Sequence, residues 1–324
     1  MNVCVVGAGA IGVFIGTHLA RGGCRVSALA RGATAAALRA HGFRFQRGGD
    51  LLTAPAEVAE DAAALGPQEL VVLAVKGPAL REVAPKVAPL LEPETMVLTA
   101  MNGVPWWFFH GLGGAHEGAA VRAVDPDGRV AALIPPRHVV GCVVHATCSV
   151  LEPGLVRHGF GRELIIGEPS GEISRRVQEL AERLVGAGFE ATVSKRIQAD
   201  VWYKLWGNMT MNPMSALTGA TCDRLLDDPL LDRFTLAIMA EAAAIGERIG
   251  CPIRQSGEER NAVTRKLGAF KTSMLQDVEA GKPLEIDGLL SAVSEIGARV
   301  GVATPCTDAL LGLTRVFAAG RGLY

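Results

Sequence analysis

The first hundred residues alternate short, nearly continuous apolar runs with segments of helical periodicity. The apolar runs lie at 2–6, 25–30, 69–75 and 96–100, and a helical pattern follows the first run from Ile11 to Arg21. Uninterrupted apolar runs of this length are typical of parallel strands that are buried on both faces of a sheet. The pattern therefore predicts an N-terminal α/β domain of the doubly wound kind.

Beyond residue 103 the periodicity is weaker, although strands can still be placed. We expect strands at 138–150, 162–166 and 189–194, and a helix at about 172–187. The aromatic run at 106–109 has two interpretations, a lid over a site or a local core, and the local core is favoured. Because this is more strand than one mononucleotide-binding half needs, the first domain is expected to span 1–195.

The rest of the chain is strongly helical in pattern. Helical periodicity covers 197–211, a basic stretch after Glu258, and the segment from Ser273 to Gly281. We therefore expect a second, helical domain over 196–324.

Charge and hydropathy exclude two classes of partner. The 324 residues carry a formal net charge of −1, without a basic block, and only 5% of them are aromatic. Both features speak against nucleic-acid binding. No apolar stretch approaches the roughly 18 residues that a membrane span requires. We therefore expect no membrane partner and a cytoplasmic protein.

The seven cysteines do not form a recognisable framework. Cys142, His145 and Cys148 are spaced three apart, but they lie in a segment with strand pattern. In a strand His145 would point away from the face that the two cysteines share, so no metal site is expected. An odd number of scattered cysteines also favours a reducing compartment.

A glycine-rich turn follows the first predicted strand and opens the first predicted helix. It reads GAGAIG at residues 7–12. Gly7 suits a tight turn, Gly9 lets a pyrophosphate approach the backbone, and Gly12 lets the helix pack closely on the strand. The amide groups near Ala10 and Ile11 would face the phosphates at the helix N-terminus. The motif predicts a dinucleotide-binding, Rossmann-type domain and hence a nicotinamide-dependent oxidoreductase.

Three residues that follow later strands bear on the identity and the binding of the cofactor. Folds specific for NAD place an acid at the end of the second strand, where this chain has Ala30 followed by Arg31. A guanidinium binds phosphate well, so NADP (NADPH) is the expected cofactor. Lys76 and Asn102 follow the third and fourth strands, at the edge where such sheets bind ligands.

A polar stripe marks the first helix of the second domain. Lys204, Asn208 and Asn212 are spaced at i, i+4 and i+8, so they share one helix face among bulky apolar neighbours. The stripe either faces a polar ligand or is a solvated face. Ser273 and Asp287 further along are both residue types that cap helices.

Taken in order, these motifs resemble the ketopantoate reductase (2-dehydropantoate 2-reductase) family over nearly the whole chain. They are GAGAIG, Arg31, AVK at 74–76, MNG at 101–103, KLWGNMTMNPMSALTG at 204–219 and TSMLQDVEAGKPLEIDGL at 272–289. The resemblance implies an all-helical C-terminal domain like that of 6-phosphogluconate dehydrogenase. It also implies reduction of a small 2-keto acid, 2-dehydropantoate, to a 2-hydroxy acid with NADPH, in pantothenate biosynthesis. Family habit suggests a homodimer.

The resemblance also assigns roles. It makes Lys204 the general acid on the carbonyl oxygen and Glu285 a catalytic residue that binds the substrate hydroxyl. Ser273 would bind the substrate carboxylate, and Asn208 and Asn212 would contact substrate. Asn102 would contact both cofactor and substrate. A positioned lysine can supply the proton that carbonyl reduction requires.

The chain departs from the family pattern in two places. Cys222, followed by Asp223, stands where the family usually has asparagine, and the segment 104–137 is longer and more aromatic. Two alternatives follow from these departures. The substrate could be another branched or aryl 2-keto acid, or the chain could be a dinucleotide-binding sensor without turnover. Retention of Lys204 and Glu285 argues against the sensor.

Overall fold

A computed structural model describes all residues, 1–324, and these form two compact units. The first comprises Met1–Met101, Phe109–Gly118 and Gly128–Ile197, and the second comprises Asn102–Phe108, Ala119–Asp127 and Gln198–Tyr324. The chain thus passes between units near Ile197, and two segments of the expected first range group with the helical unit. The domain division expected at 195/196 remains a prediction.

The first unit is built on one ten-stranded sheet with the order β4-β3-β9-β8-β7-β6-β1-β2-β5, with β10 also pairing with β9. The strands are β1 Asn2–Val6, β2 Arg25–Leu29, β3 Phe43–Arg47, β4 Asp50–Ala54, β5 Glu57–Ala59, β6 Leu70–Leu73, β7 Met96–Thr99, β8 Val139–Glu152, β9 Leu155–Gly167 and β10 Glu190–Val193. Strands β5, β2, β1, β6, β7 and β8 pair in parallel in that order. The strand order reverses between β1 and β6, which is where ligands bind in open α/β sheets.

Helices cover this sheet, as the apolar runs predict. They are α1 Ala10–Arg21, α2 Gly32–His41, α3 Leu80–Val87, α4 Arg129–Leu133 and α5 Arg175–Gly186. Alternate strand residues such as Val5 and Val72 share one core with Phe14 of α1 and Leu180 of α5. The intervening residues, such as Val71, are also fully buried. Both faces of the central strands are therefore covered, and the predicted doubly wound α/β class is confirmed.

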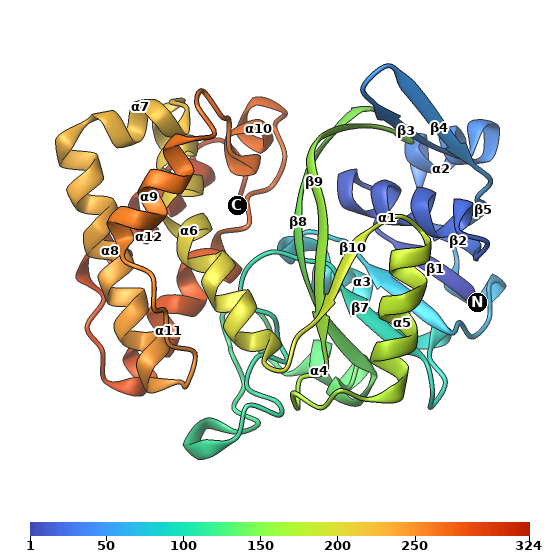
Figure 1. Cartoon of the computed structure of the whole chain (residues 1–324), viewed down its shortest axis with the longest axis horizontal. Coiled ribbons are helices and arrows are strands. Elements are labelled where there is room, and N and C mark those ends of the chain that lie inside the picture. Colours follow the sequence, from blue (N-terminus) through green and yellow to red (C-terminus); the bar gives the residue numbers. More distant parts are fainter. The chain divides into compact units, whose positions relative to one another are not determined.

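Two β-hairpins extend the sheet, and only the strands of the second were expected from the sequence. Strands β3 and β4 form an antiparallel hairpin, and β8 and β9 form a second, much longer one (Figure 1). Gly48, with φ +59°, lies in the turn of the first hairpin. Strands β3, β4 and β5 were not predicted from the sequence, and β9 begins earlier than predicted. Their half-exposed residues give a weaker pattern than the buried strands.

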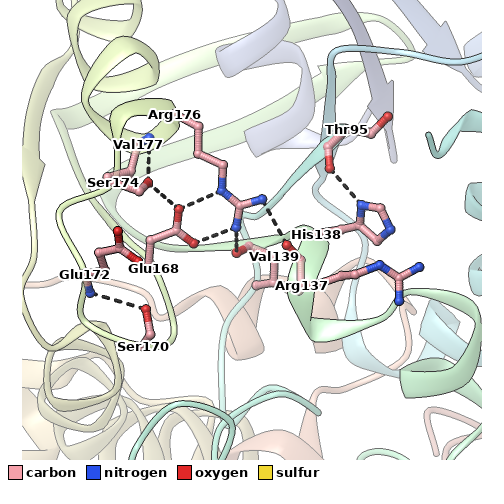
Figure 2. Close-up of polar contacts among 10 residues, drawn as sticks. All are labelled: Thr95, Arg137, His138, Val139, Glu168, Ser170, Glu172, Ser174, Arg176 and Val177. Atoms are coloured by element: carbon pink, nitrogen blue, oxygen red, sulfur yellow. Dashed lines mark hydrogen bonds and ion pairs between the residues drawn. The ribbon is translucent and has the colours of Figure 1, made fainter. Parts of the chain in front are cut away.

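A partly buried ion pair lies at one end of the sheet (Figure 2). The Arg176 guanidinium donates from Nε and Nη2 to the two carboxylate oxygens of Glu168, each at 2.6 Å, and also to the carbonyls of Arg137 and Val139. Ser174 caps α5 and donates to the same carboxylate. The pair therefore ties α5 to the turns beside β8 and β9.

A hollow of about 360 Å³ lies beside this ion pair in the first unit. Its lining includes His110, Pro136 and Glu172. It lies by the amino ends of β7 and β8, whereas sheets of this kind bind ligands beyond the carboxyl ends. Size alone therefore does not make it the functional site.

The second unit is all helical. Its helices are α6 Ile197–Thr218, α7 Cys222–Asp227, α8 Pro229–Arg248, α9 Gly257–Arg265, α10 Ser273–Glu279, the π-helical turn η6 Asp287–Ser291, α11 Ala292–Val300 and α12 Pro305–Ala319. Trp202 and Trp206 of α6 are buried and donate their indole N–H groups to the carbonyls of Ala242 and Met239. These bonds hold α6, which carries the predicted polar stripe, against α8. No helix of the chain is long and apolar enough to span a membrane.

The aromatic run is buried, so the local-core interpretation is confirmed. Trp106, Trp107, Phe108 and Phe109 are each at most 2% exposed. Within the helical unit Phe108 lies against Trp202, with 5.9 Å between ring centroids. Side chains this deeply buried pack as core and do not form a mobile lid.

The ion pair at the sheet end gives a stability test. We expect Glu168→Ala to lower the free energy of unfolding by about 2 kcal/mol, because it removes the carboxylate that accepts from the partly buried Arg176 guanidinium. The matched control is Glu179→Ala, which removes an exposed pair with Arg175 on the same helix and should leave the denaturation midpoint almost unchanged. Equal effects in urea denaturation would contradict the assigned difference.

Candidate active site

The glycine turn has the geometry that close backbone packing demands. Gly7 has φ +94°, a conformation that side-chain-bearing residues rarely adopt, and a Cβ there would lie 2.8 Å from the carbonyl oxygen of Ala74. A Cβ on Gly12 would lie 2.0 Å from the Gly7 carbonyl oxygen. A Cβ on Gly9 would meet nothing within 4 Å. Two glycines thus serve packing, and the third leaves an open approach to the backbone.

The start of α1 is suited to an anion. Gly9 is its N-cap, no side chain caps the helix, and its first turn, which begins with Ala10 and Ile11, holds no acidic residue. The first N–H groups of a helix lack partners within it and carry the positive end of its dipole. This arrangement fits the pyrophosphate of a dinucleotide.

Arg31 lies directly after β2, as the N-cap residue of α2. Its side chain is 73% exposed, and its Nη1 is 2.7 Å from Oε1 of Glu82 on α3. The Glu82 oxygen also accepts from Lys86, and the hydrogen bonds from Lys86 and Arg31 lower the pKa of that carboxyl. Glu82 was not predicted from the sequence, because nothing in the pattern of α3 links it to a residue fifty-one positions earlier.

Lys76 lies at the expected edge of the sheet. It follows β6, is half buried, and precedes the short 3-10 turn η2 Gly77–Ala79. Gly7 follows β1, the strand that pairs with β6. Lys76 and the glycine turn therefore follow the two strands between which the strand order reverses.

Three of the predicted residues meet within the helical unit. Lys204 Nζ donates to Asn102 Oδ1 at 3.0 Å, and Asn102 Nδ2 donates to Glu285 Oε2 at 3.4 Å. All three side chains are partly buried. A cation, an amide and an acid from three distant parts of the chain are thus hydrogen-bonded in a row.

The other two members of the α6 stripe lie beyond Lys204 along the helix. Asn208 is partly buried and Asn212 is 6% exposed. Asn212 therefore offers a largely buried carboxamide on the helix that carries Lys204. A carboxamide can both donate to and accept from a polar ligand.

Both cap assignments made from the sequence are wrong. The N-cap of α10 is Thr272, whose hydroxyl accepts from the Leu275 amide, while Ser273 is the first residue of the helix and is exposed. Asp287 lies inside the helix, where its carboxylate accepts from Ser291 and from the Tyr324 hydroxyl. Helix formation therefore does not require the Ser273 hydroxyl.

Cys222 has the environment of a packed core residue. It is 2% exposed, begins α7, and its backbone N–H donates to the carbonyl of Phe270. Burial, helped by the neighbouring Asp223 charge, raises the pKa of its thiol to about 11. It therefore presents an inert, neutral thiol.

This environment predicts slow chemical modification. In the native protein at pH 8 we expect iodoacetamide to leave Cys222 unmodified, because the thiolate is the reactive form and is scarce there. Peptide mass spectrometry measures the labelling, and all seven cysteines are free to serve as internal comparison. Cys306, which is less buried, should label faster, and preferential labelling of Cys222 would contradict the assignment.

The chain is similar to known proteins in both sequence and fold. The chain matches the model of the ketopantoate reductase PanE/ApbA family over residues 3–171 and that of its C-terminal domain over residues 196–318. A 2-dehydropantoate 2-reductase of Mesorhizobium japonicum is 45% identical over 100% of both chains.

Solved structures agree with this match. A protein of Ralstonia solanacearum MolK2 is 57% identical, with a TM-score of 0.96, over 100% of this chain and 99% of that one. The 2-dehydropantoate 2-reductase of Methylococcus capsulatus is 28% identical, with a TM-score of 0.84, over 99% and 98%. The chain belongs to the ketopantoate reductase family of oxidoreductases.

Proposed function

We propose that this protein reduces a 2-keto acid to a 2-hydroxy acid with NADPH, and that the substrate is 2-dehydropantoate. The family assignment and the names of its relatives support the reaction class. The observation that carries the proposal is the hydrogen-bonded row of Lys204, Asn102 and Glu285. Reduction of a carbonyl group requires a positioned proton donor, and this row holds the Lys204 ammonium group in place.

Lys204 is the proposed general acid. Reduction at carbon leaves a negative charge on the carbonyl oxygen, and an ammonium group can stabilise that charge and then donate its proton. The bond to Asn102 Oδ1 holds the end of a flexible side chain in one place. Trp202 and Trp206 hold the same helix against α8, so Lys204 lies on a rigid element.

The remaining polar residues of the helical unit are proposed to hold the substrate. Asn208 and Asn212 extend from Lys204 along α6, and their carboxamides can bond polar groups of the substrate. Ser273 offers an exposed hydroxyl at the first residue of α10 for the carboxylate. Glu285, bonded to Asn102, would accept from the substrate hydroxyl.

A nicotinamide cofactor supplies the hydride when it is bound. The open backbone at Gly9 and the uncapped start of α1 at Ala10 and Ile11 fit its pyrophosphate. Arg31, after β2, is proposed to bind the 2′-phosphate of NADPH, and Lys76 and Asn102 to contact the cofactor further along. The exposed Arg31–Glu82 bond would exchange for one to the phosphate.

A second candidate keeps the reaction and changes the substrate to another branched or aryl 2-keto acid. It follows from the two places where the chain departs from the family pattern, Cys222 and the segment 104–137. Steady-state NADPH oxidation with a panel of 2-keto acids separates the two candidates. Preference for 2-dehydropantoate supports the first, preference for an aryl acid supports the second, and no turnover on any acid would reject both.

Removal of the proton donor should slow the chemistry more than binding. We expect Lys204→Ala to lower kcat by about 10²- to 10⁴-fold, the usual contribution of a positioned general acid. The dissociation constant for NADPH, followed by fluorescence titration, should change little. Lys266→Ala, at an exposed lysine of the same unit, is the control and should retain kcat. A fully active Lys204→Ala enzyme would exclude the proposed role.

The Arg31 environment predicts opposite effects from two neighbouring changes. Arg31→Ala should weaken NADPH binding about tenfold or more and leave NADH binding nearly unchanged, since charge-assisted bonds contribute about 1.5–3 kcal/mol. Glu82→Gln should strengthen NADPH binding, because it removes the anion that competes for the guanidinium. Equal losses of NADH and NADPH affinity in Arg31→Ala would refute the 2′-phosphate assignment.

A further inference from the structure

The helix that follows Glu285 begins with an irregular turn. Helical structure runs from Ile286 to Val300, but Asp287–Ser291 is π-helical. A π turn widens the helix and replaces i→i+4 bonds with i→i+5 bonds, so a carbonyl in it can turn to a partner outside the helix. Turns of this kind are costly and are frequently found at functional sites.

A backbone contact occurs at this turn. The carbonyl of Gly288 accepts a hydrogen bond of 2.8 Å from the amide of Val104. Gly103, just before, has φ +80°, and a Cβ on it would lie 2.7 Å from the Gly288 carbonyl carbon and oxygen. Only glycine at position 103 allows the two backbones to approach this closely.

The contact is sterically one-sided. A Cβ on Gly288 would lie 3.5 Å from Gly103 Cα, which is an ordinary van der Waals distance. Alanine therefore fits at 288 but not at 103, although both residues belong to the same contact. Comparing the two alanine variants therefore distinguishes the effect of displacing the loop from the effect of merely losing a glycine.

The contact lies next to the hydrogen-bonded row of Lys204, Asn102 and Glu285. Asn102 adjoins Gly103, and Glu285 lies three residues before Gly288, so the backbone bond joins the two segments beside their side chains. The Asn102 amide must reach Lys204 with its oxygen and Glu285 with its nitrogen at once. Because the bond to Glu285 is already 3.4 Å long, a shift of the Asn102 backbone away from Glu285 would break it.

We propose that the Gly103–Gly288 contact is a positioning device that holds the Asn102 amide between Lys204 and Glu285. This inference rests on the proposed function, in which those side chains touch the substrate. Gly103 and Gly288 act through Asn102 and do not touch the reacting atoms. Displacement of a catalytic group by about 1 Å can cost on the order of 10²-fold in rate, so the contact should be visible in kcat.

Four variants of the full chain test this role. Gly103→Ala introduces the clash, Gly288→Ala does not, and Gly288→Val adds methyl groups that push on residues 102–104 without requiring positive φ. Gly301→Ala is the matched control for backbone strain, since Gly301 has φ +70° and open space around it. Melting temperature, kcat, KM for the 2-keto acid and NADPH affinity are measured for each.

We expect Gly103→Ala and Gly288→Val to lower kcat about tenfold or more with NADPH affinity unchanged. Gly288→Ala and Gly301→Ala should retain kcat. Since Gly103 acts through Asn102, the double variant Gly103→Ala/Asn102→Ala should be no slower than Asn102→Ala alone. Additive losses, or a loss in Gly301→Ala equal to that in Gly103→Ala, would overturn the positioning role.

A crystal structure of Gly103→Ala, or of Gly288→Val should the first variant not fold, gives a readout that is independent of activity. The distance from Asn102 Oδ1 to Lys204 Nζ should lengthen from 3.0 Å to beyond hydrogen-bonding range. An unchanged distance would overturn the inference even if the wild-type protein reduces keto acids. A wild-type protein without turnover would reject the proposed function, while the lengthened distance would still support the positioning.

Discussion

The side-chain amide of Asn102 is the interaction on which the proposed chemistry depends. Its oxygen accepts from Lys204 and its nitrogen donates to Glu285, so one planar group sets the places of both a cation and an acid. A carboxamide can join the two without carrying charge, because it presents an acceptor oxygen and a donor nitrogen on the same carbon. Lysine alone would sample many rotamers, and this bond restricts it to one region.

The rest of the helical unit supports that bond. Buried indole N–H bonds from Trp202 and Trp206 secure α6 on α8, and the Glu295 carboxylate accepts from the amides of Arg122 and Ala123. The segments 102–108 and 119–127 belong to the helical unit, although in the sequence they lie among the strands of the first unit. Residues on rigid elements keep the geometry that general acid catalysis needs.

Much of the first unit could be predicted from the sequence because its signals are local. Continuous apolar runs locate β1, β2, β6 and β7 to within about two residues, and the glycine motif specifies the turn that follows β1. The hairpin β3–β4 escaped prediction because its outward residues are exposed and its apolar alternation is short. The segments 102–108 and 119–127 could not be assigned, since contacts between distant residues leave no periodic pattern.

The residues of the candidate site likewise fall into those that could be predicted from the sequence and those that could not. Spacing placed Lys204, Asn208 and Asn212 on one helix face, and the family resemblance supplied Glu285 and Ser273. No pattern indicated that Asn102 joins Lys204 to Glu285, that Thr272 rather than Ser273 caps α10, or that Glu82 pairs with Arg31. Each of these depends on side chains brought together by the fold from separate elements, which a single sequence does not encode locally.

The most direct test of the account is a crystal structure of the protein with NADP⁺ and the 2-hydroxy acid that it forms. The account requires the C2 oxygen of the product to lie within hydrogen-bonding distance, about 3 Å, of Lys204 Nζ. It also requires Asn102 to keep its bonds to Lys204 and Glu285. A product whose C2 oxygen lies away from Lys204, bonded to another side chain or to water, would contradict the central claim.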